Sequence, residues 1–272
     1  MARSATRAVR LIAVALAGAL LAGCAADSGG AAASGGAAAS GGAADGPGTV
    51  YVVNSYGGTL SVIRPDGTVD RTLAVGSTPD GVAIAPANSP QAGTVYVSVT
   101  DEDVVWTLPP GGQAGDATRT AVGRGPRGVA VAPEGTPNAG TIYVLNATAW
   151  PIRTATVIRP DGTVADTIAA FGGGQRWLAV APAGTPRAGT IYVANNGDGT
   201  VSVFDPTGTL VATIAVGLGP TGVAVAPAGT PNAGKVYVTN TGDGTVTVID
   251  PDGTVSATIA VGDGPTGVVV AP

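Results

Sequence analysis

The sequence predicts an all-β protein, a five-bladed β-propeller of four-stranded antiparallel blades, and three observations lead to this prediction. A unit of 45 to 49 residues recurs five times, with starts at Gly48, Gly93, Gly140, Gly189 and Gly234. Each unit contains four short apolar runs with the alternation of strands, and turns rich in glycine separate the runs. A period of about 40–50 residues made of short strands is typical of propeller blades.

The fourth unit shows the expected elements in chain order. Its strands are residues 189–195 (GTIYVAN), 200–205 (TVSVFD), 209–216 (TLVATIAV) and 221–227 (TGVAVAP). Tight hairpins need backbone positions with positive φ, which glycine adopts without steric cost. The turns between these strands supply such glycines in Gly197-Asp198-Gly199 and Pro206-Thr207-Gly208.

The last strand of each unit alternates valine or isoleucine with alanine, as residues 82–85 and 223–226 do. A strand that is apolar on both faces is buried on both faces, so we expect it to be the innermost strand of a blade. The repeats begin with a tyrosine strand at Gly48 and end with an inner strand, residues 267–272 (GVVVAP). We therefore expect residues 267–272 to pair with residues 50–54, which would close the ring and remove two exposed strand edges.

Aromatic residues recur at fixed positions of the unit, which favours a packing role. Five of the six tyrosines occupy one repeat position, and a ligand site would not need the same tyrosine five times. Trp106, which we align with Val62 of the first unit, is also expected in the core. The five tyrosines are Tyr51, Tyr96, Tyr143, Tyr192 and Tyr237.

The N-terminus has the pattern of an export signal. Three arginines precede an apolar run at residues 11–22, which is too short to span a membrane. Leu21-Ala22-Gly23-Cys24 resembles the lipobox of bacterial lipoproteins, and this resemblance implies lipidation of Cys24 and a location on the extracytoplasmic side of the cell membrane. The alternative is an ordinary secretory signal followed by a chance cysteine.

Three domains follow from this pattern. Residues 1–23 are the predicted signal peptide, residues 24–47 are the lipidated cysteine with an Ala/Gly/Ser tether, and residues 48–272 are the propeller. The tether contains no apolar side chain larger than alanine, so we expect it to be flexible, with a span of roughly 25–30 Å.

Charge and composition limit the partners. Without residues 1–23 the chain has 10 basic and 18 acidic residues, and no basic patch with interleaved aromatics, which argues against nucleic acid. An acidic body gains nothing from anionic lipid, so attachment to the membrane depends on the predicted anchor at Cys24. No cofactor is expected, and we expect a monomer.

Residues 236–272 resemble the YVTN-type β-propeller repeat. Val236-Tyr237-Val238-Thr239-Asn240 contains the tetrapeptide that names this family, and "GTVTVID" and "GDGPTGVVV" lie where that repeat has them. The resemblance extends over residues 48–272 and implies a propeller, commonly of seven blades in that family, so five units depart from the usual number. Propellers related to that family include surface-layer proteins, lactonases and a streptogramin lyase, so the resemblance assigns no substrate.

The residue types exclude several kinds of chemistry. The chain has no histidine, so neither a Ser-His-Asp triad nor the histidine base of the similar lyase family can be present. The inner strands carry no ring of carboxylates of the kind that a metal-dependent lactonase needs. Asp198 and Asp243 could ligate calcium from their Gly-Asp-Gly turns, but plain hairpin turns are the favoured interpretation, and no metal site is expected.

The positions where the units differ most are the candidates for a specific surface. Four units have glycine in the loop that enters the inner strand, whereas the third has Gln175, Arg176 and Trp177 there. The turn after the third tyrosine strand is enlarged and contains Trp150 and Arg153. Both kinds of loop lie at one face of a propeller, where the second unit adds Arg124 and Arg127 and the acids 101–103.

Aromatic rings beside arginines suit a sugar ring, a carboxylate or a protein loop. We therefore predict a binding or protein-interaction module at the bacterial cell surface, with an envelope protein or a glycan as its partner. The alternative for the site is sequence drift, with Trp177 closing the top of the pore and Trp150 covering a blade edge. The alternative functions are a lactonase-like enzyme and a structural component of the envelope.

Overall fold

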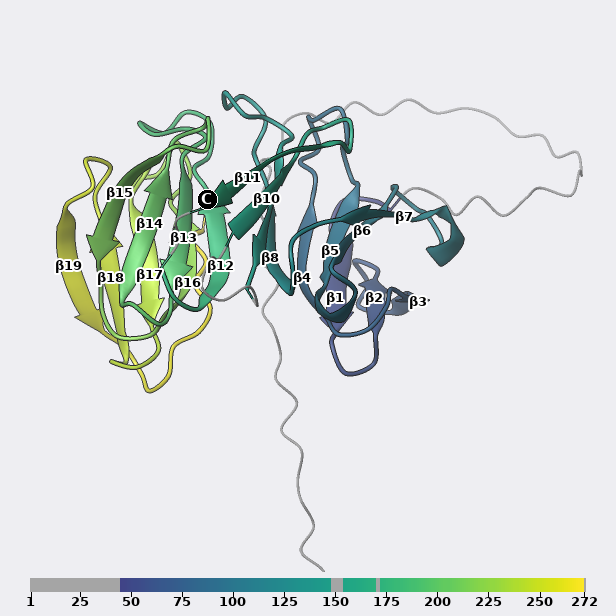
Figure 1. The fold of residues 1–272 in the computed structure, drawn as a ribbon, viewed down its shortest axis with the longest axis horizontal. Coiled ribbons are helices and arrows are strands. Elements are labelled where there is room, and N and C mark those ends of the chain that lie inside the picture. The colour runs from purple at the N-terminus through teal and green to yellow at the C-terminus, as the bar shows by residue number, and fades with distance from the viewer. Residues whose placement is uncertain (1–44, 148–153, 170–171, 272) are drawn as a thin grey trace, which may run out of the picture.

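Residues 45–147, 154–169 and 172–271 are described by the computed structural model, and they form five antiparallel sheets that follow one another along the chain (Figure 1). The first sheet has three strands and each later sheet has four. The first sheet comprises β1 (Val50–Asn54), β2 (Thr59–Ile63) and β3 (Val69–Ala74). The second comprises β4 (Pro79–Ile84), β5 (Val95–Val99), β6 (Val104–Leu108) and β7 (Thr118–Ala121), with short 3-10 helices at Thr100–Glu102 and Ala114–Asp116.

The remaining three sheets repeat the same order of strands. The third sheet comprises β8 (Pro126–Val131), β9 (Ile142–Asn146), β10 (Thr154–Ile158) and β11 (Val164–Ala169). The fourth comprises β12 (Gln175–Val180), β13 (Ile191–Asn195), β14 (Thr200–Phe204) and β15 (Leu210–Ala215). The fifth comprises β16 (Pro220–Val225), β17 (Val236–Asn240), β18 (Thr245–Ile249) and β19 (Val255–Ala260).

The inner strands are the ones that the sequence predicts. β4, β8, β12 and β16 lie side by side, each in contact with the next, while the other strands of each sheet extend outward from them. Valine and alanine alternate in these strands because a neighbouring inner strand leaves little room on one side. This arrangement of sheets confirms the predicted all-β fold with five propeller blades.

The core consists of four clusters, one between each pair of successive sheets. We call the side of a sheet that faces the following sheet its forward face, and the opposite side its rear face. In the first cluster, Tyr51, Leu60 and Leu73 of the forward face of the first sheet pack against the rear face of the second. The tyrosine position belongs to the forward face in each of the four clusters, which confirms the predicted packing role for Tyr51, Tyr96, Tyr143 and Tyr192. Tyr237 of the fifth sheet is half-buried and lies in none of these clusters.

Buried asparagines at the end of the tyrosine strands organise the sheets. Asn240 Nδ2 donates hydrogen bonds to the hydroxyls of Thr245 and Thr247 at 2.9 and 2.8 Å, which ties β17 to β18. Asn54, Asn146 and Asn195 make the equivalent pair of bonds in their own sheets.

The second sheet replaces this polar network with apolar packing. Val99 stands in place of the asparagine, and Trp106 pairs across the sheet with Val97, just as Ser61 pairs with Val52 in the first sheet. Trp106 is therefore the repeat equivalent of Ser61, and its alignment with Val62 is wrong by one residue. Its predicted place in the core is confirmed, since only 2% of its surface is exposed.

The predicted closure of the ring is not what the structure shows. Among the described residues, β1 pairs only with β2, and residues 265–271 form no strand. Thr241 Oγ1 donates a hydrogen bond to the backbone oxygen of Pro265 at 2.7 Å, so the C-terminal segment stays beside the fifth sheet. The first and fifth sheets lie at opposite ends of the arrangement in Figure 1, out of reach of one another.

Candidate binding site

The candidate residues belong to one end of the sheets, which we call the entry end. It contains the loops that enter the inner strands and the turns that follow the tyrosine strands. The opposite, exit end contains the Pro-Asp-Gly turns and the loops that leave the inner strands. Because successive strands are antiparallel, every unit contributes to both ends in the same way.

The second residue of each inner strand lies at the entry end, and these residues differ from unit to unit. They are Asp80, Arg127, Arg176 and Thr221 in neighbouring strands. Arg127 Nη1 lies 3.3 Å from Asp80 Oδ2, and both side chains are partly exposed. A pair of this kind is weak, so Arg127 keeps most of its capacity to bind an anionic group.

Trp177 occupies a position at which the inner strands otherwise need glycine. A Cβ at Gly81 would collide with the backbone oxygen of Arg127, and one at Gly222 would lie 2.5 Å from that of Thr266. In the second and fifth sheets, a hydroxyl from Ser98 or Thr239 also receives the N–H of this glycine.

The fourth sheet has neither the glycine in its inner strand nor the hydroxyl in its tyrosine strand. Trp177 is half-buried, and the tyrosine strand β13 carries Ala194 where the hydroxyl would be. The third sheet also lacks the hydroxyl, because Leu145 stands there, but it keeps Gly128, so the indole of Trp177 is the feature that sets the fourth inner strand apart.

Only part of the predicted site lies in the described residues. Trp150 and Arg153 lie outside them, and for Gln175 and Arg176 only the backbone within β12 is described. Arg124 is exposed in the loop between β7 and β8. The structure thus brings Arg127 and Trp177 to the same end of two neighbouring inner strands.

Three acidic residues of the second sheet at the entry end accept hydrogen bonds from neighbouring loops. Glu102 accepts the N–H of Ser77 at 2.8 Å and forms an ion pair with Arg119. Asp103 accepts the N–H of Gly125 at 2.7 Å. Asp101 accepts the hydroxyl of Thr78. These carboxylates connect one turn to the loops before β4 and β8, so they hold the loops rather than form an acidic site.

Asp198 and Asp243 have the same structural role. Asp198 Oδ2 accepts the N–H of Gly173 at 2.6 Å, and Asp243 Oδ2 accepts that of Leu218 at 2.5 Å. Each carboxylate therefore joins a hairpin turn to the crossover loop that enters the inner strand of the same sheet. These hydrogen bonds give both carboxylates a structural role in their turns.

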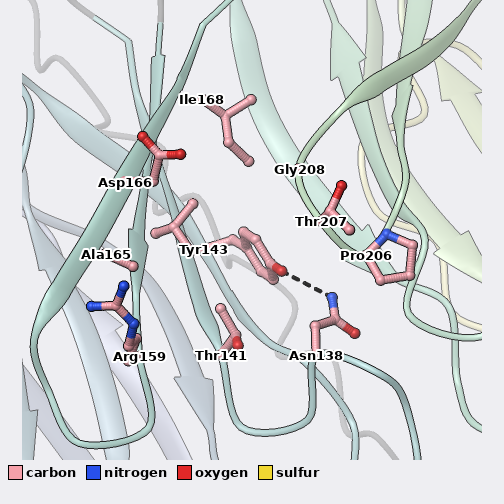
Figure 2. A pocket seen from close by; sticks show the side chains of 11 residues that line it. Asn138, Thr141, Tyr143, Arg159, Ala165, Asp166, Ile168, Pro206, Thr207 and Gly208 are labelled. Atoms are coloured by element: carbon pink, nitrogen blue, oxygen red, sulfur yellow. Dashed lines mark hydrogen bonds between the residues drawn. The ribbon is translucent and has the colours of Figure 1, made fainter.

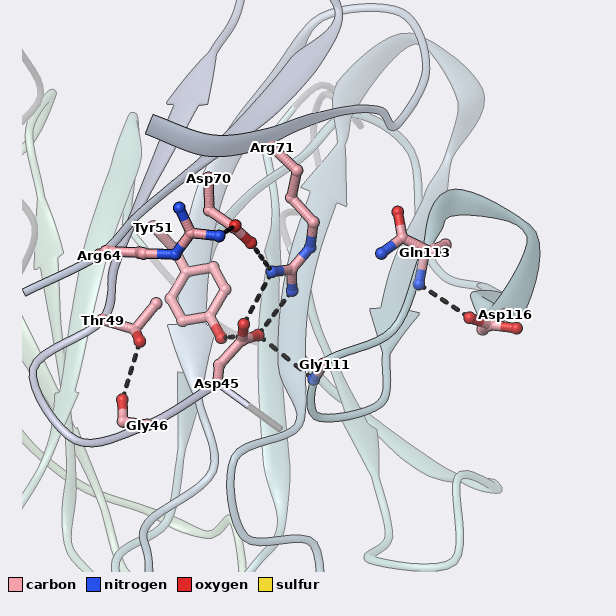
Figure 3. Close-up of polar contacts among 10 residues, drawn as sticks. All are labelled: Asp45, Gly46, Thr49, Tyr51, Arg64, Asp70, Arg71, Gly111, Gln113 and Asp116. Carbon is pink, nitrogen blue, oxygen red and sulfur yellow. Dashed lines mark hydrogen bonds and ion pairs between the residues drawn. The ribbon is translucent and has the colours of Figure 1, made fainter. Parts of the chain in front are cut away.

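Sequence reasoning missed a buried ionic cluster at the exit end (Figure 3). Arg71 donates from its two terminal nitrogens to the two oxygens of Asp45, at 2.8 and 2.7 Å. Tyr51 Oη also donates to Asp45 at 2.5 Å, and the N–H of Gly111 in the second sheet does so at 3.3 Å. Asp45 lies within the predicted tether of residues 24–47, and its side chain is held by the first sheet.

The cluster changes the acidity of its members. Burial alone would raise the pKa of the Asp45 carboxyl, but the hydrogen bonds from Arg71 and Tyr51 outweigh it and the pKa lies below its ordinary value. Burial, followed by the hydrogen bond to Asp45, raises the pKa of Tyr51. The sequence feature that could have revealed this cluster is Arg71, because no other unit has a basic residue at its position. The repeat equivalents of Arg71 are Thr118, Asp166, Ala212 and Ala257.

A cavity of about 300 Å³ lies at the exit end between the third and fourth sheets (Figure 2). Tyr143 lines it, and its hydroxyl accepts a hydrogen bond of 2.9 Å from Asn138 Nδ2. Burial raises the pKa of this hydroxyl. Asp166 stands where the first sheet has Arg71, so this cavity is the repeat equivalent of the site that Asp45 fills between the first two sheets.

In the part of the chain that the structure describes, no three acidic or cysteine side chains come together as a metal site requires. No helix in those residues is long and apolar enough to cross a membrane.

No family model and no curated protein matches the sequence. Solved structures do match the fold, at low sequence identity. An inactive variant of virginiamycin B lyase from Staphylococcus aureus, solved with quinupristin, is 12% identical with a TM-score of 0.67, over 85% of this chain and 73% of that one. A functionally unknown protein from Desulfotomaculum acetoxidans is 16% identical with a TM-score of 0.65, over 81% of this chain and 68% of that one.

A structure of the nidogen/laminin complex contains a third similar chain. It is 14% identical with a TM-score of 0.58, over 82% of this chain and 80% of that one. At these identities the likeness concerns the fold alone, and it agrees with the arrangement of the sheets. The chain has the fold of a β-propeller protein.

Proposed function

We propose that this chain is a lipid-anchored, extracytoplasmic binding module whose ligand site lies at the entry end of the propeller. The observation that carries the proposal is Trp177, a large aromatic side chain at a position where the inner strands otherwise need glycine. Arg127 of the neighbouring inner strand lies at the same end. The YVTN-type repeat and the lipid at Cys24 form part of this proposal.

The position of Asp45 supports the orientation of such a module. Arg71, Tyr51 and Gly111 hold Asp45 at the exit end, which fixes where the chain leaves the propeller on its way to Cys24. A tether that joins the propeller at the exit end leaves the entry end, with Trp177, clear of the chain that leads to the predicted anchor, and the expected flexibility of the tether lets the entry end turn toward a surface ligand.

The chemistry of the entry end favours a partner with an anionic or sugar surface. An indole and a guanidinium combine stacking with charge-assisted hydrogen bonds, which suits a glycan or a protein loop that carries carboxylates. The nidogen chain of similar fold was solved in complex with laminin, and this supports an interaction role. We favour an envelope protein as the partner, with a glycan as the second choice.

The test is capture from envelope extract of the native host. The full-length chain, solubilised in mild detergent, serves as bait beside a variant with Trp150→Ala, Arg176→Ala and Trp177→Ala. Arg159→Ala at the exit end is the control, since Arg159 is an exposed arginine outside the proposed site. We expect the wild type and the control to capture the same partner and the triple variant to lose it.

Equal capture by all three baits would overturn the placement of the site at the entry end. A chelator-sensitive hydrolysis of lactones by the wild type would instead support the enzymatic alternative. An envelope phenotype that depends on the chain but not on any of these residues would support the structural alternative.

A further inference from the structure

The cavity between the third and fourth sheets has a repeat equivalent that is filled by a carboxylate. Between the first and second sheets, Asp45 accepts hydrogen bonds from Tyr51 and Arg71. Tyr143 and Asp166 occupy the positions of Tyr51 and Arg71 in the third sheet. The cavity measures about 300 Å³, which is the lower end of the range for small-molecule sites. A comparison of the two linings therefore indicates what the cavity can bind.

Tyr143 offers the cavity a hydrogen-bond donor. Asn138, which is 9% exposed, donates from Nδ2 to Tyr143 Oη and to the backbone oxygen of Gly189, both at 2.9 Å. Because Oη accepts this bond, its own hydrogen points elsewhere, and within the described part of the chain that hydrogen has no acceptor. Burial raises the pKa of the hydroxyl, so it stays protonated at neutral pH. It can therefore donate to a carboxylate, as Tyr51 donates to Asp45.

Arg159 is a cation at the rim of the cavity. Its equivalent in the first sheet, Arg64, forms an ion pair with Asp70. The third sheet has Ala165 in place of Asp70, and within the described residues the exposed Arg159 has no ion pair. Its Nη1 lies 3.5 Å from the hydroxyl of Thr163, at the limit of a hydrogen bond. The guanidinium is therefore available to an anionic group in the cavity.

Asp166 reverses the charge that Arg71 has at the same position. Its carboxylate lines the cavity and, within the described residues, accepts only the N–H of Thr167. The third unit alone has opposite charges at the two positions, whereas the first unit has two arginines. The equivalents of Arg159 are Arg64, Pro109, Asp205 and Asp250, and those of Asp166 are Arg71, Thr118, Ala212 and Ala257. A lining of this kind suits an occupant that carries both a carboxylate and an ammonium group.

The remaining wall of the cavity is apolar. Val157 and Ile168 of the third sheet line it, and Pro206 lies across from them in the fourth sheet (Figure 2). Ile168 is only 9% exposed. Aliphatic groups in contact with this wall are removed from water, which stabilises a bound aliphatic side chain.

We propose that the cavity binds a free α-amino acid with an aliphatic side chain. The carboxylate of the amino acid receives the hydroxyl of Tyr143 and the guanidinium of Arg159. Its ammonium group donates to Asp166, and its side chain contacts Ile168 and Pro206. The cavity lies at the exit end and the site under Proposed function at the entry end, so either can fail without the other.

The experiment is isothermal titration calorimetry of the full-length chain in mild detergent. The probes are L-leucine, L-leucinamide, which lacks the negative charge, and isocaproate, which lacks the ammonium group. We expect L-leucine to bind about tenfold more tightly than either analogue, because each analogue loses one charge-assisted contact.

Asp166→Arg tests the origin of this preference. The change restores the residue of the first sheet, so we expect isocaproate to bind more tightly than L-leucine. Thr167→Arg is the matched control, because Thr167 is exposed on the opposite face of β11 and its repeat equivalent in the second sheet is Arg119. The control should keep the preference of the wild type. Circular dichroism checks that both variants retain their sheets.

Three outcomes would overturn the inference. The first is a wild type that does not bind L-leucine. The second is equal affinity for L-leucine and both analogues, which would make the cavity a plain apolar pocket. The third is a preference in Asp166→Arg that equals that of Thr167→Arg, which would show that Asp166 does not contact the ammonium group.

Discussion

Arg71 holds the carboxylate of Asp45 with two hydrogen bonds of 2.7 and 2.8 Å, and the two side chains are only 13% and 9% exposed. This ion pair connects the segment before β1 to the first sheet, and the N–H of Gly111 extends it to the second sheet. The sequence offers no repeat pattern for it, because the pair occurs once.

Replacement of Asp45 by Asn is expected to lower the free energy of unfolding by about 1–3 kcal/mol at neutral pH, because the half-buried Arg71 loses one of its two carboxylate partners and keeps only Asp70. Thermal unfolding followed by tryptophan fluorescence measures this change. Asp263→Asn is the control, since Asp263 is exposed at the far end of the chain. Equal melting temperatures for the two variants would show that the pair does not contribute.

The same pair predicts a pH dependence of stability. The pKa of Asp45 in the folded protein lies below its ordinary value, so the folded state favours the charged carboxylate. The stabilisation is complete above the pKa of the unfolded chain, about 3.9, and is lost as the pH falls through the lower folded value. The difference in stability between wild type and Asp45→Asn should therefore shrink in acid, and a constant difference would contradict this mechanism.

Trp106→Ser is expected to cost about 3–5 kcal/mol, because it leaves a cavity and a hydroxyl that Val99 cannot satisfy. The triple change Val99→Asn, Val104→Thr and Trp106→Ser installs the network of the other sheets and should recover part of this loss. Urea unfolding of the single and triple variants measures both effects. A triple variant no more stable than the single variant would show that the asparagine network does not transfer between sheets.

Gly81→Ala is expected to destabilise by about 1–3 kcal/mol, because the new Cβ would collide with the backbone oxygen of Arg127 and push β4 away from β8. Trp177→Gly restores the common residue in the fourth inner strand and should change stability much less than Gly81→Ala. Urea unfolding compares the two variants. A large loss in Trp177→Gly would mean that the indole is a core residue rather than part of a ligand surface.

Asp198→Asn is expected to cost about 1 kcal/mol, since a neutral amide oxygen accepts the N–H of Gly173 less strongly than a carboxylate does. Asp166→Asn is the control, because among the described residues the carboxylate of Asp166 accepts only the N–H of its neighbour Thr167. A chelator should leave the melting temperature of the wild type unchanged. A fall in that temperature would favour the calcium interpretation of the Gly-Asp-Gly turns.

Much of the fold follows from the repeat, and the reason is physical. A unit that recurs five times repeats its alternation of apolar and polar residues and its turn glycines. Each copy therefore predicts the same strands and turns as the other copies. The strand order, the inner position of the Val/Ala strands and the packing role of the tyrosines could therefore be predicted. Trp106 lies in the core as predicted, although its alignment was one residue off. Its position carries serine or threonine in the other sheets, so the repeat alone does not predict an apolar residue there; the equivalents are Ser61, Thr156, Ser202 and Thr247.

Features that occur once in the chain could not be predicted in this way. The Asp45–Arg71 pair and the cavity beside Tyr143 depend on side chains that are far apart in sequence and differ between units. The candidate site was predicted from departures from the repeat. The structure places Arg127 and Trp177 at one end of neighbouring strands, while Trp150 and Arg153 lie outside the described residues.

The sequence by itself determined the number of units, which strand of each unit is innermost and which residues pack between sheets. It could do so because every copy has the same alternation of apolar residues and the same turn residues. Only the tertiary structure decided how the ends relate. The angle between successive sheets is set by the packing of whole faces, which no single unit encodes. That packing leaves the rear face of the first sheet and the forward face of the fifth uncovered, at opposite ends of one chain.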